Sequence, residues 1–196
     1  MSKAKSTPSG SAKRELLINT ALTLFSRHGY HAVGIDTVLA KAGVAKMTLY
    51  NHFKSKEELI AAVLERQAQE IAADITARVS STPDQPEKQI LAVFDWLGDW
   101  FRSANFHGCL FIKASGEYPE KTDLPHKAAV AFKQTCLDLL SSLCAQLPVA
   151  DPPALARKLA LLVEGAIVLA YIHRKPDPAT DAREAAKLLV FSATNR

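Results

Sequence analysis

A short stretch near the N-terminus carries side chains suited to contact with a nucleic acid. It places six polar or flexible side chains within seven positions, at Lys46, Met47, Thr48, Tyr50, Asn51 and His52. Lysine can donate hydrogen bonds to guanine O6 and N7, and methionine can lie against a thymine methyl group. Lys54 and Lys56 follow at once and suit phosphate. The spacing predicts a segment in which base contacts set sequence and phosphate contacts set affinity.

Two short amphipathic segments must position these side chains. Residues 35–42 and 46–52 are each predicted to be helical, and Gly43 lies between them, where glycine can adopt a positive φ. Apolar residues occur at spacings that would pack both segments against a preceding helix, at Val38, Leu39, Val44, Leu49 and Phe53. This is the pattern of a helix-turn-helix, whose second helix enters the major groove of DNA.

The motif resembles the N-terminal domain of the TetR (tetracycline-repressor) family of transcriptional regulators. The likeness lies in Ala42-Gly43-Val44 followed by Thr48-Leu49-Tyr50-x-x-Phe53-Lys54-x-Lys56-x-x-Leu59, and it covers about residues 13–64. The resemblance implies that Thr48, Tyr50 and His52 hold backbone phosphates and that Asn51 touches a base edge. We expect sequence specificity to depend chiefly on Lys46, Met47 and Asn51. Taken singly, Tyr50 is equally well a half-buried core aromatic and His52 a solvated surface histidine.

The chain departs from the family pattern at three places. Val33-Gly34 stands where many members have threonines, so a phosphate contact is absent there. Asp36 occupies a position that is often basic, where it would repel phosphate but suit a helix N-terminus. Ala45 replaces a common serine cap.

Composition narrows the class of protein. The 196 residues carry a net charge of +4, and residues 1–58 alone hold nine Lys and Arg against four acids. The positive charge is thus confined to the N-terminal third, as expected if that third meets a polyanion. Three cysteines, at Cys109, Cys136 and Cys144, show no CxxC spacing, which favours a reducing cytoplasm over a disulfide scaffold or zinc module. We expect no cofactor, no metal and, with no signal or spanning segment in view, no membrane contact.

The periodicity is helical throughout and predicts an all-α fold of nine helices. We expect a mobile basic arm over 1–12, a three-helix DNA-binding head over 13–58, and a six-helix body over 59–196. Gly29 is predicted to end the first helix, and a long helix is predicted from Lys56 to Val79. Three helix starts are predicted from acidic caps, at Asp84 with Glu87 in a capping box, at Asp151-Pro152 and at Asp177-Pro178.

The family resemblance implies that the body forms a ligand pocket and a dimer interface built mainly from the last two helices. The nearly apolar run 159–172 must be covered on every side, and we expect its own domain and a second subunit to cover it. Small residues at Ala182, Ala185 and Ala186 would allow close approach. The candidate pocket residues are apolar or acidic side chains on predicted body helices: Trp96, Trp100, Phe111, Phe132, Glu164 and Val168. Aromatic residues at helical spacing are more often plain core than the lining of a pocket. Glu164 would either hold a cationic ligand or serve as a structural acid.

These observations predict a homodimeric transcriptional regulator, most simply a repressor, that binds a palindromic operator on double-stranded DNA and is released by a small-molecule effector. The alternative is a constitutive or architectural DNA-binding protein without an effector. Catalysis is not expected, because the chain lacks a Gly-rich phosphate loop, HExxH, GxSxG and paired carboxylates at catalytic spacing.

Overall fold

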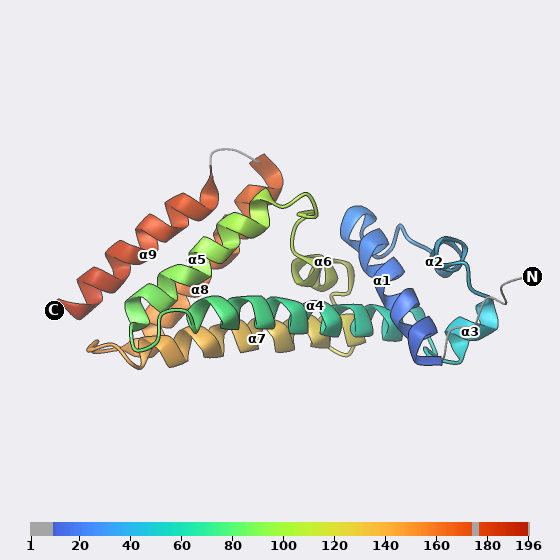
Figure 1. The fold of residues 1–196 in the computed structure, drawn as a ribbon, viewed down its shortest axis with the longest axis horizontal. Helices are drawn as coiled ribbons and strands as arrows, with labels where there is room; N and C mark the ends of the chain where they lie inside the picture. The colour runs from blue at the N-terminus through green and yellow to red at the C-terminus, as the bar shows by residue number, and fades with distance from the viewer. Residues whose placement is uncertain (1–9, 174–176, 196) are drawn as a thin grey trace, which may run out of the picture. The chain divides into compact units, whose positions relative to one another are not determined.

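A computed structural model describes residues 10–173 and 177–195, and these residues form nine helices and no strand (Figure 1). The helices are α1 (Gly10–His28), α2 (Ile35–Ala42), α3 (Lys46–Tyr50), α4 (Lys56–Val79), α5 (Pro86–Arg102), α6 (Leu110–Glu117), α7 (Leu124–Cys144), α8 (Pro152–His173) and α9 (Pro178–Thr194). The predicted all-α class is confirmed. None of the helices in this described part is long and apolar enough to cross a membrane.

The chain divides into two compact units that do not follow a single cut in the sequence. The first contains the described part of Met1–Arg66 together with Leu110–Ala129. The second contains Gln67–Cys109 and the described part of Val130–Arg196. The expected head over 13–58 therefore lies in a unit that also includes α6 and the start of α7. Both α4 and α7 contribute residues to each unit.

The first unit is built around α1, on which α2 and α3 pack. Leu17, Ala21 and Phe25 recur at spacings of four, so they share one face of α1, and all three side chains are fully buried. Gly29 ends α1 with a φ of 80°, and its amide donates to the Phe25 carbonyl at 3.0 Å, as predicted. Helix α1 begins at Gly10, so residues 10–12 of the expected arm are helical, and the rest of that arm lies outside the described residues.

The second unit packs α5 and α9 together and sets α8 against both. The buried faces of α9 include Ala182 and Ala186, which lets α9 approach its neighbours within the unit closely. Ala182 and Ala186 therefore allow close approach inside this unit, whereas close approach of the half-buried Ala185 to a second subunit stays a prediction. Asp151 and Asp177 cap α8 and α9 as predicted, with their carboxylates accepting the amides of Ala154 at 2.9 Å and Ala179 at 3.1 Å.

The predicted capping box at the start of α5 was wrong. Asp84 has a left-handed φ of 57°, which places its carboxylate outside the helix, and Gln85 precedes the first turn without a side-chain hydrogen bond. The proline at position 86 still begins the helix, as its fixed φ favours.

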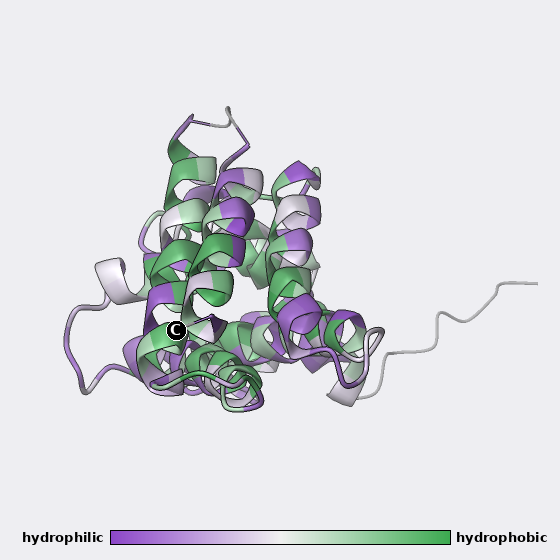
Figure 2. Cartoon of the chain, turned by 90° about the vertical axis from the view of Figure 1, so that its left-hand side faces the viewer, coloured by the Kyte–Doolittle hydropathy of each residue, from purple (hydrophilic) through white to green (hydrophobic). Residues whose placement is uncertain are grey.

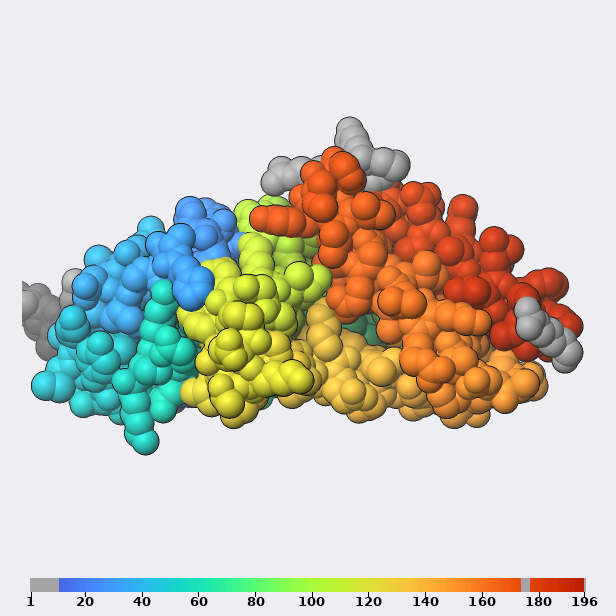
Figure 3. Space-filling view, turned by 180° about the vertical axis from the view of Figure 1, so that it is seen from behind, coloured from blue at the N-terminus to red at the C-terminus, as the bar shows by residue number. Residues whose placement is uncertain are grey.

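Helices α8 and α9 leave large apolar side chains uncovered. Leu161 is 73% exposed and Phe191 66% exposed, and Val168, Ile172 and Leu188 are also exposed. On α8 the residues 161, 168 and 172 recur at helical spacing and so form one stripe. Figure 2 shows hydrophobic residues along these C-terminal helices, and Figure 3 shows α8 and α9 side by side on one face. We call this exposed set the α8–α9 surface.

Candidate nucleic-acid interface and ligand pocket

The turn between α2 and α3 has the geometry that the sequence predicts. Gly43 has a φ of 65° and a ψ of 35°, and its amide donates to the Leu39 carbonyl at 2.9 Å, closing α2. Nothing lies within 4 Å of where a Cβ at Gly43 would be, so the positive φ alone favours glycine here. Ala45 then precedes α3 without a side-chain hydrogen bond.

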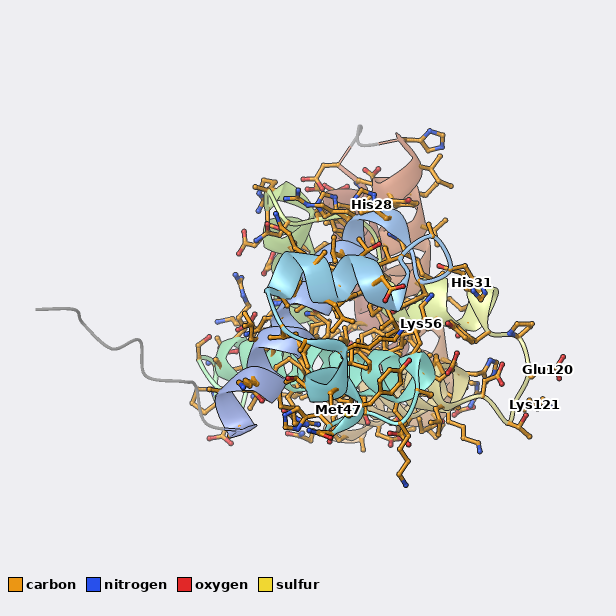
Figure 4. The ribbon with its side chains drawn as sticks, turned by 90° about the vertical axis from the view of Figure 1, so that its right-hand side faces the viewer. His28, His31, Met47, Lys56, Glu120 and Lys121 are labelled. Carbon is orange, nitrogen blue, oxygen red and sulfur yellow. The ribbon has the colours of Figure 1, made fainter. Side chains whose placement is uncertain are left out.

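Helix α3 turns apolar residues inward and its candidate DNA-binding residues outward. Leu49 and Phe53 are buried, whereas Met47 is 72% exposed and Tyr50 is 46% exposed. Tyr50 is thus presented to solvent and is not a core aromatic. Figure 4 labels Met47 on α3 and Lys56 at the start of α4. Lys46 and Thr48 also belong to α3, so four of the predicted contact residues share one short helix.

The recognition segment is shorter than predicted. Helix α3 ends at Tyr50, and Asn51 and His52 lie in the following turn. The helix stops there because the amides of His52 and Phe53 both bond to the Leu49 carbonyl, which completes the last turn around that residue. Asn51 remains exposed and His52 is half-buried, its ring 6.4 Å from that of Phe53.

The start of α4 carries two lysines and an occupied cap. Lys54 is exposed and Lys56 is half-buried. The Ser55 hydroxyl accepts the Glu58 amide at 3.2 Å, and the Glu58 carboxylate accepts the Lys54 amide at 2.7 Å. This is a variant of the capping box, in which Glu58 reaches the amide before the Ser55 cap; sequence reasoning missed it, although Ser55-x-x-Glu58 signals it. One helical amide is consequently satisfied by the protein, so an anion at this end would depend on the lysine side chains.

Lys46 has an acidic neighbour. Its Nζ lies 3.6 Å from Asp36 Oδ1, and both side chains are mostly exposed, at 63% and 84%. An ion pair this exposed is weak and screened by salt. Lys46 can therefore leave Asp36 for DNA, but the carboxylate places a negative charge beside the candidate interface.

Helix α6 holds the end of α1 within the first unit. The Glu117 carboxylate accepts the amides of Tyr30 at 2.9 Å and His31 at 2.6 Å. Lys113 Nζ donates to the Ser26 carbonyl at 2.7 Å, and the buried Tyr30 hydroxyl donates to the Leu110 carbonyl at 3.0 Å. We call this set of contacts the α1–α6 clamp. Nothing in the sequence predicted it, because its partners lie 80 to 87 residues apart.

The second unit contains an apolar cavity lined by α4, α5, α7 and α8 and by Cys109. Its volume is about 60 Å³. Of the predicted pocket residues, Trp96, Trp100, Phe132 and Glu164 line it. The indole rings of Trp96 and Trp100 are stacked, with centroids 5.3 Å apart and planes at 22°. Trp96 is buried and Trp100 is half-buried.

Two predicted pocket residues lie elsewhere. Phe111 is 1% exposed on α6, in the first unit. Val168 is 40% exposed on α8, one residue beyond the lining residue Ile167 and so turned by about 100° from it. Lys133, Cys109 and Cys136 line the cavity and were not predicted to do so. The sequence signalled only that all three are polar or polarisable residues, two of them on α7 and Cys109 directly before α6.

Lys133 is the partner of Glu164. Its Nζ donates to both carboxylate oxygens, at 2.7 and 2.8 Å, and the two side chains are 28% and 38% exposed. Burial opposes the charge on Lys133, but electrostatic attraction to its neighbours Cys109 and Glu164 outweighs it and holds the pKa of Lys133 above its ordinary value. Burial also raises the pKa of Cys136 to about 11, so this thiol is protonated near neutral pH. Glu164 is therefore satisfied inside its own unit.

The chain is similar in sequence and in fold to known transcriptional regulators. A family model of bacterial regulatory proteins, the tetR family, matches residues 17–63. The crystal structure of a TetR-family transcriptional regulator from Streptomyces coelicolor is 34% identical, with a TM-score of 0.87, and the match covers 94% of this chain and 97% of that one. The similarity therefore extends over both units and not only over the helix-turn-helix.

Two curated regulators match shorter stretches. The transcriptional activator FasR of Mycolicibacterium smegmatis is 37% identical over 88 residues, which are 43% of this chain and 40% of that protein. The transcriptional repressor NemR of Escherichia coli is 30% identical over 105 residues, 53% of each chain. The chain thus spans about half or less of the length of these two relatives.

Proposed function

The chain belongs to the TetR family of transcriptional regulators, and from that premise we propose that it is a cytoplasmic, homodimeric repressor that binds a palindromic operator and is released by a small-molecule effector. The observation that carries the proposal is α3, where buried Leu49 and Phe53 fix a helix that presents Lys46, Met47 and Tyr50 to solvent. Base-edge contacts from such a helix specify sequence, and neighbouring lysines supply phosphate affinity.

The dimer is proposed from the α8–α9 surface. Exposed leucine, isoleucine and phenylalanine side chains on two adjacent helices favour burial against a partner. A second copy of the chain suits this surface because a two-fold interface joins the same patch on both subunits. Two recognition helices spaced by about 34–36 Å would then fit successive major grooves.

Effector control is proposed from the cavity and from chain connectivity. Cys109 lines the cavity and directly precedes Leu110, the first residue of α6. Helix α6 in turn carries Lys113 and Glu117, which bind the end of α1. A ligand that favours one position of Cys109 would bias the α1–α6 clamp. It can shift the balance of DNA-binding and non-binding forms only by its difference in affinity for the two.

We propose repression and not activation, because a repressor that leaves the DNA when the effector binds permits transcription without a further step. The matched relatives include a named repressor and a named activator, so their names alone do not choose. The alternative function is a constitutive or architectural DNA-binding protein with an inert body. The two are separated by screening small molecules for release of a DNA site selected by the protein. Release at saturable concentration supports effector control, and a complex indifferent to every ligand that binds the cavity supports the alternative.

A further inference from the structure

The polar residues that line the cavity of the second unit restrict the charge of its ligand. Its lining is apolar except for the Lys133–Glu164 pair, two thiols and the indole N–H groups. Lys133 Nζ contacts both oxygens of Glu164 at 2.7 and 2.8 Å, so the two formal charges cancel where they meet the cavity. An organic cation would find the Glu164 carboxylate already paired, and an organic anion would find the same of the Lys133 ammonium. Entry of either would displace water from the partly exposed pair and leave one charge without a free partner.

The same pair leaves one hydrogen-bond donor for a neutral ligand. An ammonium group has three N–H donors, and Glu164 takes two of those of Lys133. A carbonyl or hydroxyl oxygen on the ligand can accept the third, and a hydrogen bond from a charged donor is stronger than one between neutral groups. Cys136 adds no charge of its own near neutral pH, because burial raises the pKa of its thiol to about 11.

The size and shape of the cavity restrict the rest of the ligand. Its volume of about 60 Å³ is small, since water occupies about 30 Å³ in the liquid and an apolar cavity of about 150 Å³ admits benzene. The Trp96–Trp100 stack forms part of the wall, and the half-buried Trp100 is the ring with room to yield. The cavity as it stands is smaller than one that admits benzene, so a single flat ring is the largest body we expect it to take, and its entry requires Trp100 to move.

We propose that this cavity takes an uncharged, apolar molecule the size of one aromatic ring that bears a single oxygen acceptor for Lys133, and that it rejects organic cations and anions of the same size. This inference rests on the proposed function only in naming that molecule the effector. Binding itself is independent of DNA.

The test uses four ring-matched probes on the full-length purified protein near neutral pH: benzyl alcohol, toluene, benzoate and protonated benzylamine. Binding is measured by calorimetry and by tryptophan fluorescence. We expect benzyl alcohol to bind about tenfold more tightly than toluene, which lacks the acceptor. We expect benzoate and benzylamine to bind at least about tenfold more weakly than benzyl alcohol. Equal binding of either ion, or no binding of any probe, would overturn the inference.

Two variants each remove one charge of the Lys133–Glu164 pair, and they should shift the ligand preference in opposite directions. Glu164→Gln leaves the Lys133 ammonium unpaired and should shift the preference toward benzoate. Lys133→Met leaves the Glu164 carboxylate unpaired and should shift it toward benzylamine. Lys127→Met is the matched control, because Lys127 is exposed on the same helix and lies outside the lining. Circular dichroism checks that each variant is folded, and if one variant fails to fold the other still decides. Unchanged preferences in a folded variant would contradict the role of the pair.

The ligand selectivity of the cavity and the proposed DNA-binding function can be contradicted independently of each other. Ligand selectivity as described, without a specific DNA site, would retain the inference and overturn the proposed regulator. Specific DNA binding with a cavity that prefers ions would do the reverse.

Discussion

The Glu117 carboxylate accepts a hydrogen bond from the backbone amide of Tyr30 at 2.9 Å, and thereby joins α6 to the residue that follows the end of α1. Gly29 makes this approach possible. A Cβ at that position would lie 2.8 Å from Glu117 Oε1, and the φ of 80° there is one that side-chain-bearing residues rarely adopt. The first unit therefore extends beyond the helix-turn-helix to include α6.

Removing the Glu117 carboxylate should loosen this attachment. We expect Glu117→Ala to lower the stability of the first unit by about 1–2 kcal/mol, because the part-buried amide of Tyr30 and the exposed amide of His31 lose a charged acceptor, which water replaces only in part at Tyr30. Hydrogen exchange should quicken at the amides of Tyr30 and His31. Glu120→Ala is the control, since Glu120 is exposed nearby and its side chain has no partner among the hydrogen bonds described above. Unchanged protection at Tyr30 would show that the carboxylate does not hold the α1–α6 clamp.

The residues of α3 and the lysine at the start of α4 should differ in their effect on DNA binding. Lys46→Ala or Met47→Ala should flatten base preference at one position of the site, at a cost of about 1–3 kcal/mol for the preferred base. Lys56→Ala should weaken all sequences alike and reduce the salt slope by about 1. Selection of bound duplexes for each variant measures the first effect, and titration across salt concentrations measures the second. If both α3 variants selected the parental site unchanged, the orientation assigned to α3 would be wrong.

Asp36 should weaken DNA binding in the parental protein. Its carboxylate lies 3.6 Å from Lys46 Nζ on an exposed surface. Asp36→Asn therefore removes a negative charge that repels DNA phosphates, and it also removes the ion-pair partner of Lys46. We expect affinity to rise about two- to fivefold at low salt, the range of one exposed ion pair, and the gain to shrink as salt screens it. Fluorescence anisotropy with a labelled duplex provides the measurement. A gain that persists undiminished at high salt would point to a cause other than charge.

The α8–α9 surface should be needed for assembly. Leu161→Glu or Phe191→Glu places a charge on side chains that are 73% and 66% exposed, so the folded subunit should tolerate it while a dimer should not. Sedimentation velocity should show monomer at concentrations where the parental protein is dimeric. Val130→Glu, at another exposed apolar residue on α7, should leave the assembly unchanged. A dimer that survives both substitutions would place the interface elsewhere.

The helices that the sequence predicted well are those with strong signals at both ends. The bounds of α4, Lys56–Val79, agree with prediction, because a Ser-Ser-Thr-Pro segment stops the helix and Ser55 caps it. Helix α3 was predicted two residues too long. Leu49 and Phe53 are four apart and would be buried on one face whether or not the helix continued, so periodicity cannot locate its end.

The pocket was harder to predict because its polar residues depend on how α7 and α8 are aligned. Lys133 and Glu164 are 31 residues apart, and nothing local fixes which residue of α7 faces Glu164. The aromatic pair on α5 was found because Trp96 and Trp100 are four residues apart on one helix. Phe111 was predicted to line the pocket but lies in the first unit. Periodicity shows that α6 has a buried face, but it does not show which unit buries that face.

Selection of duplexes from a random pool by the purified full-length protein, followed by binding at several salt concentrations, tests the central claim most directly. We expect a symmetric site with two half-sites about one helical turn apart and a steep fall of affinity with salt. Such a site would follow from two copies of α3 presented by one dimer. Weak binding without sequence preference, or a single asymmetric half-site bound by a stable dimer, would contradict the account.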